Sequence, residues 1–196
     1  MTRSLLLGHP LPWKFRTEKC NEDCPQLLGY QATISAPSMH AKAVELLLRN
    51  VLPLRGEKHE KGEETVIGIQ GRPRRILDIG SGSGFLVQVF AELADERSVI
   101  IGVDHIEELR QLGEHNMCKY ARGAAFVASN RETDGKAGQK IWETLPLTIT
   151  VVGNGIHVGA AAVRWHSELV QQLRSPDRLF IPVAEEEGNW FSDVYI

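Results

Sequence analysis

A run of glycines and serines is the part of this sequence best suited to bind a small polar ligand. Residues 80–84 read Gly-Ser-Gly-Ser-Gly. They follow residues 76–79, three of which are apolar, and they precede residues 85–93, which have the apolar spacing of a buried helix. Glycine tolerates positive φ and lets a ligand approach the backbone, and the first turn of a helix presents unpaired N–H groups. The sequence therefore predicts a strand, a glycine turn and a helix that together bind a polar group.

An acidic residue follows where such a unit would hold the sugar of a nucleotide. Residues 99–103 form a second apolar run, and Asp104 comes next, 24 positions after Gly80. In nucleotide-binding α/β folds a carboxylate at this point accepts hydrogen bonds from a ribose diol. Nicotinamide-binding and S-adenosylmethionine-binding folds share this pattern, and a tight turn without a ligand is a third interpretation.

The elements that must position these residues alternate between helix and strand. A helix is expected over residues 37–51 and a second one from His105 toward residues 118–120. Strands are expected at residues 147–152, 156–160, 178–183 and 190–196, with a helix at about residues 162–173 and a turn at residues 175–177. This alternation predicts an α/β fold with a mainly parallel sheet. In the first helix, the expected core residues are Ala43, Val44, Leu47, Leu48 and Val51, and the expected exposed residues are Lys42, Glu45 and Arg49.

One connection conflicts with that sheet. Only residues 153–155 separate the expected strands at 147–152 and 156–160. Neighbouring parallel strands need a crossover of about a dozen residues. Either the two segments do not both enter the sheet in parallel, or this chain lacks a crossover helix.

Length and composition predict one globular domain. The chain has 196 residues, of which 42% are hydrophobic and 24% are charged. We expect an irregular arm over residues 1–28, a folded domain over residues 29–196 that begins with a short extended segment at 29–36, and an exposed insertion at about residues 53–75. Residues 121–146 are ambiguous, with a short strand possible at 125–127.

The same bulk properties argue against several partners. The net charge of −3 offers no basic surface for nucleic acid, and the chain has no run of about 20 apolar residues that could span a membrane. Cys20, Cys24 and Cys118 are interpreted as reduced thiols of a cytoplasmic protein, with a metal or disulfide role for the first two as the less favoured alternative. No metal site is expected among the seven histidines.

Five blocks in order distinguish between the two cofactor classes. They are QATISAPSMHA at residues 31–41, LDIGSGSG at 77–84, IGVDHI at 101–106, VVGNG at 151–155 and IHVGAAA at 156–162. Together these blocks closely resemble the protein-L-isoaspartate (D-aspartate) O-methyltransferase family. The resemblance covers about residues 20–196, apart from residues 55–75 and 119–146. A nicotinamide oxidoreductase becomes the weakest hypothesis, because residues 31–41 have no role in it.

The resemblance implies a Rossmann-like S-adenosylmethionine-dependent methyltransferase fold, incomplete at both ends. It implies S-adenosyl-L-methionine as methyl donor, S-adenosyl-L-homocysteine as product, and methylation of the free carboxylate of L-isoaspartyl and D-aspartyl residues in damaged proteins, which begins their repair. The acceptor carboxylate is already ionised at pH 7, so the reaction needs no strong base. Alignment and exclusion of water can supply about 7–11 kcal/mol of the acceleration. The expected partners are isoaspartyl proteins and peptides, and the expected oligomeric state is a monomer.

The resemblance also assigns roles to individual residues. Ser35 would be the catalytic residue, near the substrate carboxylate and the donor, with a plain helix cap as the alternative. Asp78 would face the methionine part of the cofactor, or else bond turn amides. His157 is interpreted as structural. The remaining expected cofactor contacts are Ala32, Thr33, Ile34, His40, Gly80, Gly82, Ser83, Asp104 (to the ribose), His105, and Asn154 with Gly155 (beside the adenine). Without the resemblance, His40 would be interpreted as a surface or core histidine.

The chain departs from the family pattern at several points. An unrelated arm replaces the N-terminal helix, Ser38 stands where many eukaryotic members have histidine, and Asn154 replaces aspartate. The short link at residues 153–155 replaces a crossover, and the match stops before the last strands of the family. We expect these differences to weaken cofactor binding and catalysis. A degenerate member that binds S-adenosylmethionine or damaged protein without turnover is the alternative function.

Overall fold

The computed structural model describes residues 22–52, 73–95, 97–121, 123–124, 153–162, 167–184 and 190–194. The expected strands at 147–152 and 125–127, the insertion at 53–72 and most of the N-terminal arm lie outside these residues.

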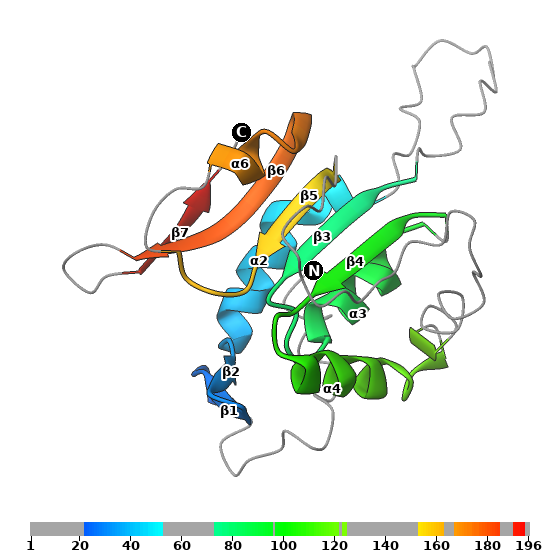
Figure 1. The fold of residues 1–196 in the computed structure, drawn as a ribbon. Helices are drawn as coiled ribbons and strands as arrows, with labels where there is room; N and C mark the ends of the chain where they lie inside the picture. The colour runs from blue at the N-terminus through cyan, green and yellow to red at the C-terminus, as the bar shows by residue number, and fades with distance from the viewer. Residues whose placement is uncertain are drawn as a thin grey trace.

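A five-stranded sheet forms the centre of the fold (Figure 1). Its strand order is β4-β3-β5-β6-β7, in which the first four strands are parallel and β7 is antiparallel to β6. The bounds are β3 Arg75–Ile79, β4 Val99–Val103, β5 Gly153–Val158, β6 Leu173–Ala184 and β7 Trp190–Val194. The predicted α/β fold with a mainly parallel sheet is therefore confirmed.

Helices cover both faces of this sheet. Successive side chains of a strand point to opposite faces, and the apolar ones on each face pack against helices. Ile76 of β3 packs in a cluster with the helices α2 (Pro37–Val51) and α3 (Phe85–Leu93), whereas Leu77 packs in the cluster of the other face with α6 (Ser167–Val170). The helix α4 (Glu107–Met117) packs against α3 (Figure 1). It begins two residues later than the predicted start at His105.

The prediction for α2 holds in detail. The helix has the predicted bounds, and proline at its first position suits the helix start because its missing N–H would be unpaired there anyway. Leu48 is only partly buried, and the other four predicted core residues are buried. Arg74 donates to the carbonyl oxygens of Arg49 and Leu52 at the C-terminus of α2, where cations are favourable.

Two segments differ from the predictions. Residues 153–155 are not a link, because they form the start of β5 and pair with both β3 and β6. The strand β6 begins at Leu173, where a helix was expected to end, and it includes the predicted turn at 175–177. Between Gly153 and Gly155 the pairing with β6 shifts register.

A small separate hairpin precedes α2. It consists of β1 (Gln26–Gly29) and β2 (Ala32–Ile34), joined by Tyr30 and Gln31 with φ of 53° and 59°. Positive φ at both turn residues matches the right-handed twist of a hairpin. The irregular arm expected over residues 1–28 therefore ends earlier, since β1 starts at Gln26, and the expected extended segment at 29–36 contains the turn and β2.

The described helices include none that is long and apolar enough to cross a bilayer. The described residues also contain no cluster of His, Cys, Asp and Glu that could hold a metal ion.

Gly84 provides a test of the packing between α3 and α4. It precedes α3 with φ of +77°, and a Cβ there would lie 3.0 Å from the Cα and carbonyl oxygen of Gly113. We expect Gly84→Ala to lower the free energy of unfolding by about 2–4 kcal/mol, through backbone strain and overpacking. Urea denaturation measures this change.

Gly155→Ala is the matched control. A Cβ at Gly155 would make only ordinary contacts, the shortest being 3.4 Å to the Ile76 Cδ1. We expect a change within about 1 kcal/mol for this variant. Equal stability of the two variants would contradict the close approach at Gly84.

Candidate functional site

A cleft opens at the carboxyl ends of β3 and β5. The next strand in the chain after β3 is β4, which pairs on one side of β3, and β5 pairs on the other side of β3. The strand order therefore reverses at β3. Ligands of open α/β sheets bind at such a reversal. The cleft has about 330 Å³ of space including its open mouth, and its lining residues are Leu28, Thr33, Ile34, Ser35, His40, Asp78, Gly80, Ser81, Gly82, Ser83, Phe85, Leu86, His157 and Gly159.

Backbone hydrogen bonds fix the glycine turn on one side of the cleft. The N–H groups of Gly80 and Ser81 donate to the Val103 carbonyl at 2.8 and 3.0 Å, and the Gly84 N–H donates to the Ser81 carbonyl at 2.9 Å. The buried Asn116 of α4 donates from Nδ2 to the Ser83 carbonyl at 3.1 Å. The turn is therefore held from both β4 and α4.

Asp104 is the third support of this turn. Its Oδ2 accepts from the Gly82 N–H at 2.9 Å, and its Oδ1 accepts from the Ile106 N–H at 3.0 Å. The side chain is buried, and neither Asp104 nor the exposed His105 lines the cleft. Asp104 thus positions the glycine turn, and its carboxylate keeps lone pairs for a further donor. Its expected contact with a ribose stays a prediction.

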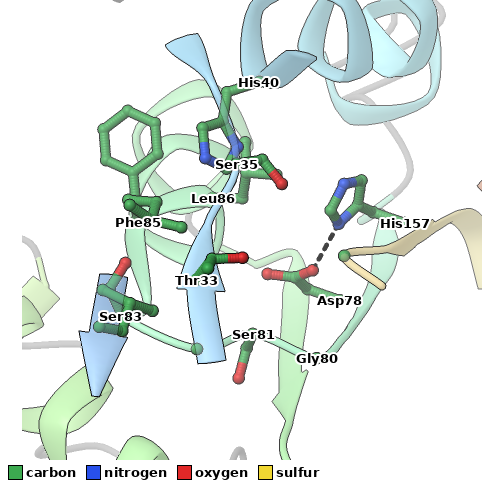
Figure 2. A pocket seen from close by; sticks show the side chains of 14 residues that line it. Thr33, Ser35, His40, Asp78, Gly80, Ser81, Ser83, Phe85, Leu86 and His157 are labelled. Carbon is green, nitrogen blue, oxygen red and sulfur yellow. Dashed lines mark hydrogen bonds and ion pairs between the residues drawn. The ribbon is translucent and has the colours of Figure 1, made fainter. Parts of the chain in front are cut away.

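Asp78 and His157 form a buried pair in the wall of the cleft (Figure 2). They lie opposite each other on the paired strands β3 and β5, and His157 Nδ1 lies 2.6 Å from Asp78 Oδ1. The structure therefore brings His157, which the sequence analysis interpreted as structural only, into the site. Its position at the carboxyl end of a strand, two residues before Gly159, was the available signal.

Hydroxyl groups lie across the cleft from this pair. Figure 2 shows Thr33, Ser35 and Asp78 directed toward the same hollow. The N-cap of α2 is Ala36, with no side-chain capping bond, so Ser35 is not the helix cap. The predicted contacts Thr33 and Ser35 therefore lie in the same cleft as the predicted Asp78.

His40 contributes an unpaired polar atom. Its ring lies 5.1 Å from that of Phe85 at a tilt of 60°, and its Nε2 is buried with no hydrogen-bond partner among the described residues. Burial, and to a smaller extent the nearby His157, lower the pKa of His40 to about 3. The imidazole is therefore neutral at pH 7.

The floor of the cleft is backbone. The Gly159 N–H donates to the Ile79 carbonyl at 2.7 Å, and a Cβ at Gly159 would lie 2.7 Å from the Gly80 carbonyl oxygen. Ser81 also lines the cleft and has a buried Oγ that, among the described residues, has no partner. The sequence analysis did not select Ser81 or Gly159, nor the lining residues Leu28, Phe85 and Leu86.

Two predicted cofactor contacts lie elsewhere. Asn154 accepts from the N–H of Arg75, the first residue of β3, at 3.0 Å, and it donates to Asp177 at 3.2 Å. Gly155 is buried against α2. The cleft lies at the carboxyl ends of β3 and β5, whereas Asn154 and Gly155 lie at the amino end of β5. The structure therefore does not bring them to the cleft, because they begin β5 and are not in a loop at its carboxyl end. Their expected contact with an adenine stays a prediction.

The remaining predicted contacts divide into two groups. Ala32 pairs with Gly29 in the hairpin and does not line the cleft. The structure does bring together eight of the predicted residues, namely Thr33, Ile34, Ser35, His40, Asp78, Gly80, Gly82 and Ser83.

Comparison with known proteins identifies the family of this arrangement. A family model described as protein-L-isoaspartate(D-aspartate) O-methyltransferase matches residues 9–55 and 67–194. The chain belongs to this methyltransferase family. The predicted resemblance is therefore confirmed over most of the chain.

Individual members of the methyltransferase family match over much of their length. Protein-L-isoaspartate O-methyltransferase of Caenorhabditis elegans is 34% identical over 173 residues, which cover 86% of this chain and 64% of the relative. Protein-L-isoaspartate O-methyltransferase 1 of Arabidopsis thaliana is 34% identical, with 89% of this chain and 64% of the relative covered. The chain thus spans just under two thirds of the length of these relatives.

Solved structures support the fold. A putative protein-L-isoaspartate O-methyltransferase from Plasmodium falciparum, in complex with S-adenosyl-L-homocysteine, aligns with a TM-score of 0.66 at 20% identity. The alignment covers all of this chain and 87% of the Plasmodium chain. The Rossmann-like methyltransferase fold predicted from the sequence is confirmed.

Asn154 gives a test of where the methyltransferase site lies. We expect Asn154→Ala to lower the free energy of unfolding by about 1–3 kcal/mol, because buried Asp177 and the Arg75 N–H lose a partner. Affinity for S-adenosyl-L-homocysteine, the compound bound by the Plasmodium protein, should stay unchanged. Calorimetry and urea denaturation give the two quantities. A loss of affinity without a loss of stability would return Asn154 to the site.

The lowered pKa of His40 predicts a pH dependence of stability. The unfolded chain binds a proton at His40 below pH 6.5, whereas the folded protein does so only near pH 3, so acid favours unfolding. We expect His40 to account for a loss of about 1–2 kcal/mol between about pH 7.5 and about pH 5. Urea denaturation of the unaltered chain and His40→Phe at both pH values isolates this contribution. An equal loss in both proteins would show that the pKa of His40 is not lowered.

Proposed function

We propose that this chain transfers a methyl group from S-adenosyl-L-methionine to the free carboxylate of L-isoaspartyl and D-aspartyl residues in damaged proteins, the first step of their repair. The observation that carries the proposal is the juxtaposition, in one cleft, of the segment Thr33–Ser35 at the end of β2 with the glycine turn at residues 80–84 and with Asp78. Membership of the family supports it. So does the product S-adenosyl-L-homocysteine in the Plasmodium relative.

The lining residues suit such a donor. The glycine turn and Gly159 offer bare backbone to a close ligand. The unpartnered His40 Nε2 is a buried atom whose desolvation costs about 1–3 kcal/mol unless a polar group satisfies it. Asp78 supplies one carboxylate for a cationic group. When bound, S-adenosylmethionine supplies an electrophilic methyl group on a sulfonium.

The residues of this chain then bind and orient the reactants. In our proposal Asp78 binds the amino-acid part of the donor, and neutral His40 and the turn at residues 80–84 also contact the donor. Asp104 acts indirectly, because its bond to the Gly82 N–H positions the turn. The Ser35 hydroxyl donates a hydrogen bond to the acceptor carboxylate. Because that carboxylate is ionised at pH 7, no lining residue has to remove a proton.

Apolar side chains complete the mechanism by excluding water. Ile34, Phe85 and Leu86 line the cleft beside the polar groups. A drier cleft strengthens the hydrogen bonds to both reactants and limits competing hydrolysis. Holding two reactants in line can contribute about 7–11 kcal/mol to lowering the barrier.

We further propose that the substrates are isoaspartyl proteins and peptides rather than nucleic acids, and that the protein is a cytoplasmic monomer whose methyltransferase domain occupies most of residues 29–196. The net charge of −3 is consistent with a partner other than nucleic acid. Because the chain departs from the family at the expected crossover, we propose weaker cofactor binding and turnover than in its relatives.

The decisive experiment measures methyl transfer from labelled S-adenosylmethionine to a peptide containing isoaspartate, beside its normal aspartate twin, scored as base-labile methanol. We expect label only with the isoaspartyl peptide. Ser35→Ala should reduce kcat/KM by about ten- to a hundredfold, the value of one hydrogen bond to a charged group.

Two controls make this result specific. Ser38→Ala changes an exposed serine on α2 that does not line the cleft, and it should leave kcat/KM within about twofold. Calorimetry with S-adenosyl-L-homocysteine reports cofactor binding separately. Binding without any turnover would favour the non-catalytic alternative, and full activity of Ser35→Ala would remove that residue from the proposed role.

A further inference from the structure

We propose that His157 is a positioning residue, which holds the Asp78 carboxylate so that its second oxygen binds a cationic amino group in the cleft. The inference rests on the proposed function, because the amino group in question is that of S-adenosylmethionine or its product. It concerns how the chain prepares that contact.

The pair belongs to a row of side chains across three adjacent strands. Asp78 on β3 is in register with His157 on β5, and His157 is in register with Phe180 on β6. Residues in register on paired strands point to the same face. The row therefore lies under α2 and α3, and its Asp78 end borders the cleft.

Ring packing fixes the direction of the donor. The His157 ring stacks on Phe180 with centroids 5.3 Å apart at 13°, and the Phe90 ring meets it edge-on at 6.4 Å. Both Asp78 and His157 are buried, with exposures of 1% and 5%. A buried carboxylate requires a strong donor, and an imidazole N–H at 2.6 Å from Oδ1 supplies a charge-assisted bond.

This arrangement leaves one carboxylate oxygen for the cleft. Oδ1 faces His157, and the second oxygen points toward the hollow beside Thr33 (Figure 2). Among the described lining residues Asp78 is the one acidic side chain, and His40 beside it is neutral because burial lowers its pKa to about 3. The negative charge of the cleft is thus concentrated at one oriented oxygen, which suits an ammonium group that can donate to it.

A purely structural role for His157 would have different consequences. If its ring only fills space between Phe90 and Phe180, then His157→Phe should serve as well, whereas His157→Asn should not. A positioning role predicts the reverse, because asparagine keeps an N–H near the position of Nδ1 and phenylalanine does not. These two variants therefore separate the interpretations.

The test measures binding of two probes by calorimetry. S-adenosyl-L-homocysteine carries the amino group, and 5′-methylthioadenosine shares the adenosine and thioether but lacks the amino-acid part. We expect His157→Phe and Asp78→Asn to lower the affinity for S-adenosyl-L-homocysteine by about tenfold. The affinity of His157→Asn should stay within about threefold of that of the unaltered chain. Affinity for 5′-methylthioadenosine should be unchanged in all three.

His157→Phe leaves the buried Asp78 carboxylate without its partner, and this variant alone could fail to fold. A double variant covers that case. In Asp78→Asn/His157→Phe that charge is gone, and the double variant should bind S-adenosyl-L-homocysteine as Asp78→Asn does. A further loss, an equal loss for both probes, or a His157→Asn variant that binds no better than His157→Phe would overturn the positioning role. Failure of the unaltered chain to bind S-adenosyl-L-homocysteine would instead overturn the proposed function, and the inference with it.

Discussion

The parallel pairing of β3 with both β4 and β5 is the constraint on which the cleft depends. Because β3 has a neighbour on each side, its carboxyl end is enclosed by the ends of two other strands, and the chain leaving it must turn sharply at Gly80. The carbonyl of Val103 on β4 receives two N–H groups of that turn, and the N–H of Gly159 after β5 donates to the Ile79 carbonyl of β3. The sheet topology therefore determines both the position of the cleft and its backbone floor.

Buried polar groups around this cleft fall into two sets with different consequences. Asp104 and Asn116 lie behind the turn. Asp104 accepts from the Gly82 and Ile106 N–H groups and Asn116 donates to the Ser83 carbonyl, which makes both part of its support. His40 and Ser81 line the cleft, and His40 Nε2 has no partner among the described residues. Since native proteins pair most of their buried polar atoms, an unpaired nitrogen on a residue that lines the cleft favours a polar ligand there. Asp78 and His157 connect the sets, because both line the cleft while the His157 ring also packs against Phe90 and Phe180 in the core.

Local patterns in the sequence were sufficient for much of this structure. The helix at residues 37–51, the strands around the glycine turn and the turn itself were predicted, because apolar periodicity and glycine spacing act within a few residues. The role of His157 was missed because its partner lies 79 positions away and meets it only through strand register. The same limit explains why the place of Asn154 and Gly155 at the start of β5 was not predicted. Whether three residues form a link or the start of a strand depends on pairing with β3 and β6, which no local pattern contains.

The position of Asn154 also gives a physical reason for an amide in place of the aspartate that the resemblance to the family leads us to expect. At the amino edge of the sheet its Nδ2 donates to buried Asp177 while its Oδ1 accepts from the Arg75 N–H. An aspartate could keep the second bond only, and it would bring a second carboxylate next to Asp177, which disfavours ionisation of both. The amide is thus the side chain that fits this place, and the substitution acts on the sheet rather than on the cleft. Consequently the loss of an acidic group at this position is no argument against ligand binding, which depends on the opposite ends of the same strands.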